Sequence, residues 1–267
     1  VVATQNTVPV FNVYDGAKID GQIYAAGYAK WNISGGDIKA DTGMEIRAGE
    51  LNMTGGSLVG TATPTSVKPN GNGGTSDGVG LAIAQHTTRL PINVNISSGT
   101  ISGFTGLLES NPQKGSSADI EKINVSISGG NFTASNGGTN AAFSEDNRLT
   151  ITGGTFSSDV SAYVADGYIQ TESGTVEALN ANNAVAKIND TYYKTLASAV
   201  AAAESDATVT LLKNTKEKVT VSKNLTVDLG GHTLTGSDLT NGNGKPERVA
   251  FTANAGTVTI QNGLIDG

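Results

Sequence analysis

The chain has 267 residues and a net charge of −7, and this length is enough for one or two domains. Only 15% of the residues are charged and the excess is acidic. This argues against binding to nucleic acid, whose phosphates require patches of Lys and Arg. There is no cysteine, so disulfide scaffolds and thiolate metal sites are excluded. No run of about 20 apolar residues occurs, so the sequence predicts no transmembrane segment.

A short phrase recurs along the chain. Residues 8–23 already read as strand and turn, with Asp15-Gly16 as a turn pair. Val13 lies one repeat before the first full copy of the phrase, ISGGDI, which begins at Ile33. Further copies begin at Met53, Ile96, Ile127 and Ile151, and a looser copy begins at Ile260. Because repeats of this kind determine architecture, we take them as the basis of the fold prediction.

The aligned copies share three apolar columns. They lie two residues before the phrase, at its first residue and at its last residue, and all are apolar in every copy. The position between the first two columns is polar: Asn32, Asn52, Asn95, Ser126, Thr150 and Thr259. This alternation is typical of a strand with one buried face. The glycine pair within the phrase favours a turn that needs positive φ.

The first five copies begin 20, 43, 31 and 24 residues apart. A basic unit of about 20–24 residues with insertions explains these steps. One such unit cannot bury its own apolar face, whereas stacked units can. The sequence therefore predicts an all-β fold, a right-handed parallel β-helix or solenoid, with the hand taken from the general chirality of parallel-strand connections.

Two insertions interrupt the repeats, at residues 60–78 and 109–121. Both are expected to leave the fold after the same apolar column, so that they lie along one side of the molecule. Insertions of this kind are often the binding face of a solenoid, although a solvated loop without a role is the simpler alternative.

Two domains are expected, residues 1–180 and residues 181–267. Residues 156–168 read as the cap that closes the first β-helix, and residues 171–183 as a linker or closing strand. A hairpin over residues 184–193 then begins a second β-helix unit. It is followed by a short capping helix near residues 196–204 with Thr195 as N-cap, and by strands at 209–212, 219–221 and 225–229. A third insertion spans residues 236–248. The last repeat carries no cap, so we expect either a longer native chain or an open end that stacks against something.

Two segments carry a resemblance to a known group of proteins. Residues 151–163 (ITGGTFSSDVSAY) resemble the closing segment of right-handed β-helix surface proteins of gut Firmicutes, within the pectate-lyase-like solenoid superfamily. Residues 186–234, from AKI through LASAV to DLGGHTL, resemble the opening segment of the same kind of domain. The resemblance implies an extracellular, modular protein with an adhesive or glycan-facing role. It carries over no catalytic residue.

Aromatic residues that stack on sugar rings are the first candidates for a binding site. Tyr14, Tyr24, Tyr28 and Trp31 gather near the start of the chain. Trp31 falls in an inward column, so we expect it in the core. Tyr24 and Tyr28 are the candidates for an outward, ligand-binding position.

The insertions supply the remaining candidate ligand-binding residues: Asn70, Asn72, Asp77, Asp119, Asn241 and Asn243. Oxygen ligands from Asn70, Asn72 and Asp77 are of the kind that calcium accepts, but the loop lacks the acidic density of a strong site. No other metal or cofactor is expected.

An enzymatic alternative is a polysaccharide lyase or glycoside hydrolase of the β-helix type. Hydrolysis needs two carboxylates about 5–10 Å apart, and Asp41 with Glu45, or Glu145 with Asp146, would be the pairs. The simpler expectation is a solvated carboxylate at a turn. A lyase would need calcium and a flanking base, and the scattered Arg47, Arg89, Arg148 and Arg248 lack such motifs. His86 and His232 are isolated and form neither a zinc site nor a triad.

The leading prediction is a non-enzymatic, extracellular cell-surface protein that acts as an adhesin-like or glycan-binding module or stalk. Its expected partner is a glycan or a host or cell-surface protein, and end-to-end stacking of β-helices is a second expected contact. A purely structural spacer is the third alternative.

Overall fold

The computed structural model describes residues 7–64, 68–70, 73–75, 77–240 and 246–267. These residues form mostly β-strands with two short α-helices, which confirms the all-β class. None of the helices in these ranges is long and apolar enough to span a membrane. The chain divides into two compact units: unit 1 is Val1–Asp166 with Gln170–Glu177, and unit 2 is Gly167–Ile169 with Ala178–Gly267.

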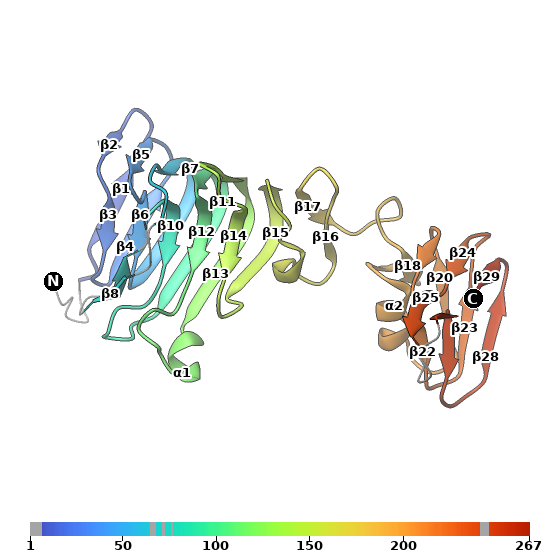
Figure 1. The fold of residues 1–267 in the computed structure, drawn as a ribbon. Helices are drawn as coiled ribbons and strands as arrows, with labels where there is room; N and C mark the ends of the chain where they lie inside the picture. Colours follow the sequence, from blue (N-terminus) through green and yellow to red (C-terminus); the bar gives the residue numbers. More distant parts are fainter. Residues whose placement is uncertain (1–6, 65–67, 71–72, 76, 241–245) are drawn as a thin grey trace. The chain divides into compact units, whose positions relative to one another are not determined.

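The first sheet has ten strands, eight of which lie wholly in unit 1 (Figure 1). Its main order is β1-β4-β7-β11-β13-β15-β17-β16, and β2 and β5 pair beside β7. Neighbours from β1 to β15 are parallel, whereas β17 is antiparallel to β15. The strands are β1 (Val10–Val13), β2 (Lys18–Asp20), β4 (Ala29–Ile33), β5 (Asp37–Ala40), β7 (Gly49–Gly60), β11 (Ile92–Gly103), β13 (Ile123–Ala134), β15 (Leu149–Phe156), β16 (Tyr168–Gln170) and β17 (Thr175–Ala178).

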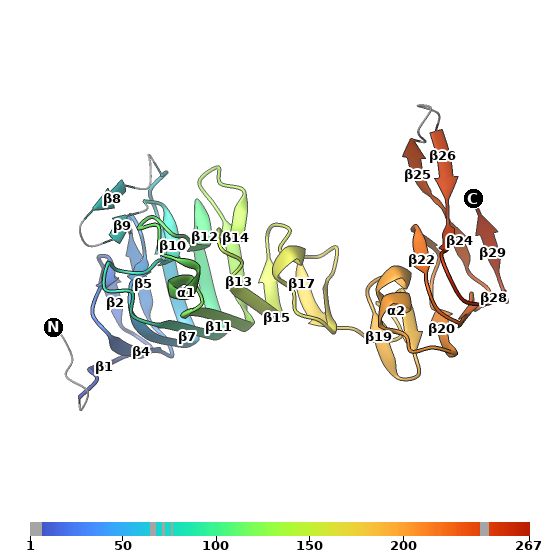
Figure 2. The same ribbon diagram turned by 90° about the horizontal axis from the view of Figure 1, so that it is seen from below.

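The second sheet of unit 1 has five strands in the order β14-β12-β10-β6-β3, all parallel. Figure 2 separates the two sheets: β4, β7 and β11 run along one side, and β10, β12 and β14 along another. The strands are β3 (Ile23–Ala25), β6 (Met44–Ile46), β10 (Val79–Ile83), β12 (Thr105–Glu109) and β14 (Asn140–Ser144).

The apolar columns of the sequence stack in register. One column runs Val13, Ile33, Met53, Ile96, Ile127 and Ile151, each paired with the next across parallel strands. The exposed fraction of these side chains is 8% at Val13 and at most 1% at the others. The prediction that these residues form one buried column is confirmed. Each fully buried aliphatic side chain contributes roughly 1.5–3 kcal/mol relative to an exposed one.

The glycine pair of the phrase has two separate causes. The second glycine has positive φ, as predicted, for example +98° at Gly130 and +103° at Gly154, but these residues lie within β13 and β15 and not in the predicted turn. The first has a different reason: a Cβ on Gly129 would lie 2.2 Å from the carbonyl oxygen of Ser97, on the neighbouring strand. The strands therefore approach too closely at this point for any side chain.

Asparagines on the outer face of the first sheet form a hydrogen-bonded row, which we call the amide ladder. The Nδ2 atom of each residue donates to Oδ1 of the preceding one: Asn32 to Asn12 at 2.9 Å, Asn52 to Asn32 at 3.3 Å, and Asn95 to Asn52 at 3.1 Å. The first three positions of the polar column, Asn32, Asn52 and Asn95, are therefore hydrogen-bonded to one another and are not only a solvated face.

The expectation that the first two insertions leave the same column is wrong. The first joins β7 of the first sheet to β10 of the second and contains the antiparallel pair β8 (Lys68–Asn70) and β9 (Gly73–Thr75). The second joins β12 of the second sheet to β13 of the first and contains α1 (Ser117–Ile120). The prediction failed because residues 105–109 form a separate strand, so the second insertion begins one strand later than the phrase.

Unit 2 begins with the predicted antiparallel hairpin, β18 (Ala186–Ile188) and β19 (Thr191–Tyr193). The helix α2 (Leu196–Ala202) follows with Thr195 as N-cap, as predicted. The backbone N–H groups of Leu196 and Ala197 donate to the carboxylate of Glu217 at 3.0 and 2.9 Å. Glu217 therefore holds the first turn of the helix from the next strand region.

The hairpin belongs to a five-stranded sheet of order β19-β18-β20-β23-β28, in which β18 is antiparallel to β20 and the neighbours β20, β23 and β28 are parallel. In two further sheets of unit 2, β21, β24 and β29 are parallel neighbours, and β22 pairs with β27 in parallel. The third insertion forms the antiparallel pair β25 and β26. The bounds are β20 (Ala207–Leu211), β21 (Thr215–Lys216), β22 (Val219–Val221), β23 (Leu225–Asp228), β24 (Thr233–Thr235), β25 (Ser237–Thr240), β26 (Pro246–Val249), β27 (Phe251–Ala253), β28 (Val258–Gln261) and β29 (Leu264–Asp266).

Candidate functional site

Aromatic side chains line a cavity of about 200 Å³ at the β1 and β3 edges of unit 1. Phe11 comes from β1, Trp31 from β4, Tyr24 from β3, and Tyr28 from the connection between β3 and β4. We call this the aromatic cavity. The structure thus brings together the two predicted tyrosines, Tyr24 and Tyr28, and adds two rings to them.

Phe11 and Trp31 form the parallel wall of the aromatic cavity. Their ring centres are 4.2 Å apart and their planes differ by 12°. Both residues occupy the inward column, as expected for Trp31, but the column ends at β1, so Phe11 is 45% exposed and Trp31 is only partly buried. The expectation that Trp31 lies in the core is therefore only partly met, because its ring also lines a cavity.

The indole Nε1–H of Trp31 is shielded from solvent, yet it meets no hydrogen-bond acceptor among the described residues. A buried donor without a partner costs about 1–3 kcal/mol. Tryptophan in proteins normally pairs this group.

Tyr24 is held by a charged pair behind it. The guanidinium carbon of Arg47 lies 5.9 Å from the centre of the Tyr24 ring, within the range of a cation–π contact. Arg47 in turn donates from Nη2 to Glu45 at 3.0 Å, and both side chains are almost fully buried. Burial raises the pKa of Tyr24, and the positive charge of Arg47 opposes that rise. The pair therefore limits the freedom of a ring that is 40% exposed.

The candidate residues of the first and third insertions are far in sequence from the residues of the aromatic cavity. The backbone of Asn70 ends β8, and Asp77 is an exposed turn residue. Asn72, Asn241 and Asn243 fall outside the described residues. No group of three or more metal-ligating His, Cys, Asp or Glu side chains occurs in the described parts of the chain.

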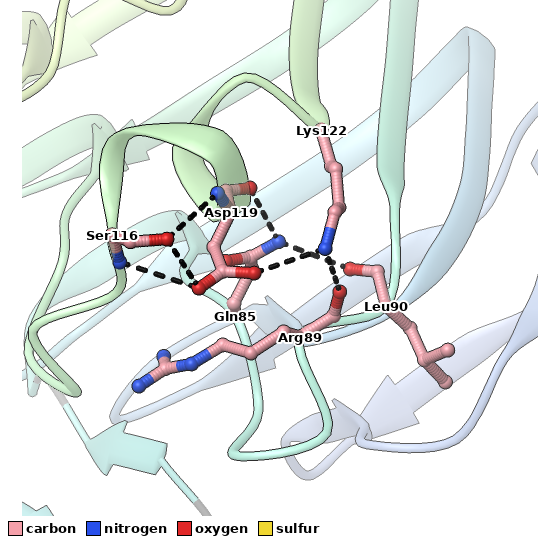
Figure 3. Close-up of polar contacts among 6 residues, drawn as sticks. All are labelled: Gln85, Arg89, Leu90, Ser116, Asp119 and Lys122. Carbon is pink, nitrogen blue, oxygen red and sulfur yellow. Dashed lines mark hydrogen bonds and ion pairs between the residues drawn. The ribbon is translucent and has the colours of Figure 1, made fainter.

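Asp119 lies in α1, where its carboxylate bonds within the protein (Figure 3). It accepts from the backbone N–H and hydroxyl of Ser116 at 3.3 and 2.8 Å, and from Nζ of Lys122 at 2.9 Å. These bonds hold the pKa of the Asp119 carboxyl below its usual value. Its carbonyl oxygen accepts from Nε2 of Gln85 at 2.9 Å. The visible role of Asp119 is thus to cap α1 and attach it to the residues after β10.

A carboxylate that the sequence did not single out lies in the interior of unit 1. Glu109 is fully buried at the end of β12, in register with Ile83 on one side and Ser144 on the other. Its Oε2 accepts from the hydroxyl of Ser144 at 2.5 Å and from the N–H of Asp146 at 3.1 Å, while Oε1 has no partner among the described residues. Burial raises its pKa, against the effect of these two bonds.

The expectation of solvated carboxylates is wrong at two of the four positions considered for hydrolysis. Glu45 is fully buried and paired with Arg47. Asp146 is partly buried, and burial raises its pKa. Glu145 is exposed and accepts from the N–H of Asn111 at 2.9 Å, and Asp41 is exposed. The repeated phrase covers neither position: Glu45 is the middle residue of β6, whose three residues are all buried, and Asp146 lies in the connection between β14 and β15.

Sequence reasoning missed Phe11 and Glu109, and it considered Arg47 only for lyase chemistry and not as a neighbour of Tyr24. Phe11 lies two residues before Val13, so the column argument that placed Val13 one repeat before Ile33 also contained the pairing of Phe11 with Trp31. No comparable signal distinguishes Arg47, which follows β6, or Glu109, which ends β12, because the repeated phrase covers neither position.

Comparison with known proteins adds no assignment. No family model, no curated protein and no solved structure matches this chain.

Proposed function

We propose that this chain is a non-enzymatic, carbohydrate-binding module of a cell-surface protein, built as a right-handed parallel β-helix of the kind that its sequence resembles in gut Firmicutes. The proposed location is extracellular. The aromatic cavity is the proposed binding site, and the observation that carries the proposal is the set of four aromatic side chains that line it.

Two features support the solenoid architecture. In unit 1, parallel pairing connects the same columns through five successive strand steps, although the chain between them varies in length. In unit 2, the parallel pairs repeat in three sheets in the same chain order. Parallel strands joined through intervening elements take a right-handed connection in almost all proteins.

The chemistry of the aromatic cavity suits a sugar ring. A pyranose presents an apolar face of C–H groups and a rim of hydroxyls. Aromatic faces bury the first, and tyrosine hydroxyls form hydrogen bonds with the second. The Phe11–Trp31 pair and the partly exposed Tyr24 and Tyr28 supply both kinds of contact on a scaffold of strands.

Trp31 is the only tryptophan in the chain, so its fluorescence reports on the aromatic cavity alone. We would titrate the protein with a panel of neutral and acidic oligosaccharides and follow Trp31 emission. Binding should shift or quench the emission in a saturable manner. Tyr24→Ala and Tyr28→Ala should each weaken binding by about tenfold, equivalent to about 1.4 kcal/mol.

Tyr14→Ala is the matched control, since Tyr14 is 64% exposed near the same edge but does not line the cavity. Its affinity should equal that of the wild type. Unchanged Trp31 emission across the whole panel would overturn the proposal and leave the spacer reading.

The enzymatic alternative finds no support in the site. Glu109 and Glu45 are fully buried, and Glu45 is neutralised by Arg47. Neither carboxylate is placed to reach a polysaccharide, so we do not propose hydrolysis or lyase chemistry.

A second proposed contact is end-to-end stacking of two copies. Among the described residues, β1 and β29 each pair on one side only in their sheets, and both carry an exposed apolar side chain, Val10 at 55% in β1 and Leu264 at 58% in β29. Unpaired strand edges of this kind readily accept another strand. Sedimentation over a range of concentrations tests this: association that Leu264→Lys abolishes supports it, and a monomer at all concentrations contradicts it.

A further inference from the structure

A polar groove of about 580 Å³ crosses the outer face of the first sheet, and we call it the amide groove. Its lining includes Glu50 of β7, Asn93 and Asn95 of β11, Asn124 of β13, and Arg148 at the start of β15. The register places Glu50 beside Asn93 and Asn93 beside Asn124. The groove therefore runs across four successive strands, over three steps of about 4.8 Å, or about 14 Å.

The asparagines of the groove keep free hydrogen-bonding capacity. Nδ2 of Asn124 donates to Oδ1 of Asn93 at 3.2 Å, and Asn95 ends the amide ladder by donating to Asn52. A side-chain amide has two N–H donors and an oxygen with two lone pairs, and each of these bonds uses one of them. The remaining donors and acceptors belong to partly or fully exposed side chains. A row of paired donors and acceptors fits a chain of hydroxyl groups.

Arg148 gives one end of the groove a positive charge. Its Nε donates to the carbonyl oxygen of Ile123 at 2.9 Å, which fixes the orientation of the guanidinium. Its two terminal nitrogens make no hydrogen bond to any described residue. The other charged group of the lining, Glu50, is 3.7 Å from Nζ of Lys30. A guanidinium held in this way pairs well with a carboxylate through two parallel bonds.

We propose that the amide groove binds a linear carbohydrate that bears carboxylates. Arg148 pairs with a carboxylate of the ligand, and Asn93, Asn95 and Asn124 bond its hydroxyls along the direction in which the strands stack. This inference deepens the proposed carbohydrate-binding function but uses a surface that the aromatic cavity does not include.

Two hexasaccharides that differ only in the groups at stake test the proposal: β-1,4-linked glucuronate and β-1,4-linked glucose. Their affinities for the full chain would be measured by calorimetry at physiological salt. We expect the glucuronate hexamer to bind at least tenfold more tightly. Arg148→Gln should remove this preference, whereas Lys39→Gln, which removes an exposed charge of β5 outside the groove, should leave it intact.

Asn124→Asp is a second variant that keeps the shape of the side chain but adds a negative charge to the groove. It should weaken glucuronate binding at least tenfold and leave glucose binding unchanged, even if Arg148→Gln fails to fold. Equal affinity of the two hexamers for the wild type, or a preference that survives both substitutions, would overturn the inference. Trp31 emission distinguishes binding in the amide groove from binding in the aromatic cavity. If the glucuronate preference is observed but Trp31 emission does not change, the proposed site in the aromatic cavity is refuted and the amide groove is not.

Discussion

The hydroxyl of Ser144 donates to the carboxylate of Glu109 at 2.5 Å, inside unit 1 and away from solvent. The two residues are register partners on β14 and β12. They place a titratable group in the same stacked position that Ile46 and Ile83 fill on the preceding strands. This exchange of an apolar residue for a carboxyl group has a consequence for the pH dependence of stability.

Glu109 should make unit 1 less stable as pH rises. Burial raises its pKa in the folded state, so the folded protein holds the proton more tightly than the unfolded chain does. The resulting stabilisation is complete below the unfolded pKa of about 4.5 and is lost as pH rises through the folded pKa. Urea unfolding between pH 4 and 8 should show a smaller decline in Glu109→Gln than in the wild type. The exposed Glu121→Gln serves as control, and an identical pH profile for Glu109→Gln and wild type would contradict the assignment.

The buried column predicts the cost of a core substitution. Ile127 is fully buried and paired with Ile96 and Ile151, so Ile127→Ala should lower the free energy of unfolding by about 2–5 kcal/mol. Ser126→Ala, one residue earlier on the outer face, should change it by less than about 0.5 kcal/mol. Denaturant unfolding of both variants gives the comparison, and similar values for the two would mean that the column is not the core.

Two substitutions can separate the two reasons for glycine, which are close approach of a neighbouring strand and positive φ. At Gly129, a Cβ would lie 2.2 Å from a backbone oxygen, so Gly129→Ala forces two strands apart. At Gly137, φ is +83° but no atom lies within 4 Å of the added Cβ, so Gly137→Ala carries only the backbone cost, of about 1–2 kcal/mol. Thermal unfolding should show the larger loss for Gly129→Ala. The reverse order would show that backbone conformation, and not close approach, selects glycine in the phrase.

Glu217 should stabilise α2 from outside the helix. It accepts from the N–H groups of Leu196 and Ala197, which have no acceptor within the helix. Glu217→Ala should lower the stability of unit 2 by about 1–3 kcal/mol. The exposed Glu204→Ala is the control. Hydrogen exchange of the Leu196 and Ala197 amides measures the effect directly: faster exchange is expected only in Glu217→Ala.

Much of the fold could be predicted because the repeat expresses it directly. The inward column through Ile33, Met53 and Ile96 followed from alternation alone, and the helix after Thr195 followed from its N-cap. The sheet to which each strand belongs could not be predicted. The strand from Thr105 to Glu109 follows the phrase without a turn signal strong enough to mark it as a separate strand. The misplaced second insertion came from this single omission.

The candidate site was predicted only in part, for a physical reason. Tyr24 and Tyr28 were recognised by residue type. Their neighbours Phe11, on β1, and Arg47, directly after β6, are close to them only because β1 pairs with β4 and β3 pairs with β6. Whether the chain binds carbohydrate, and at which of the two surfaces, stays a prediction that the proposed titrations address.

The register between neighbouring strands does not depend on the length of the chain segment that joins them. Ile33 and Met53 are 20 residues apart and Met53 and Ile96 are 43 apart, yet both pairs meet in the same column. A segment at the β7–β10 junction can therefore lengthen, shorten or be exchanged for a foreign sequence while the interior keeps its contacts. Such a molecule can acquire new binding specificities through its surface insertions while the buried column that stabilises the fold stays the same.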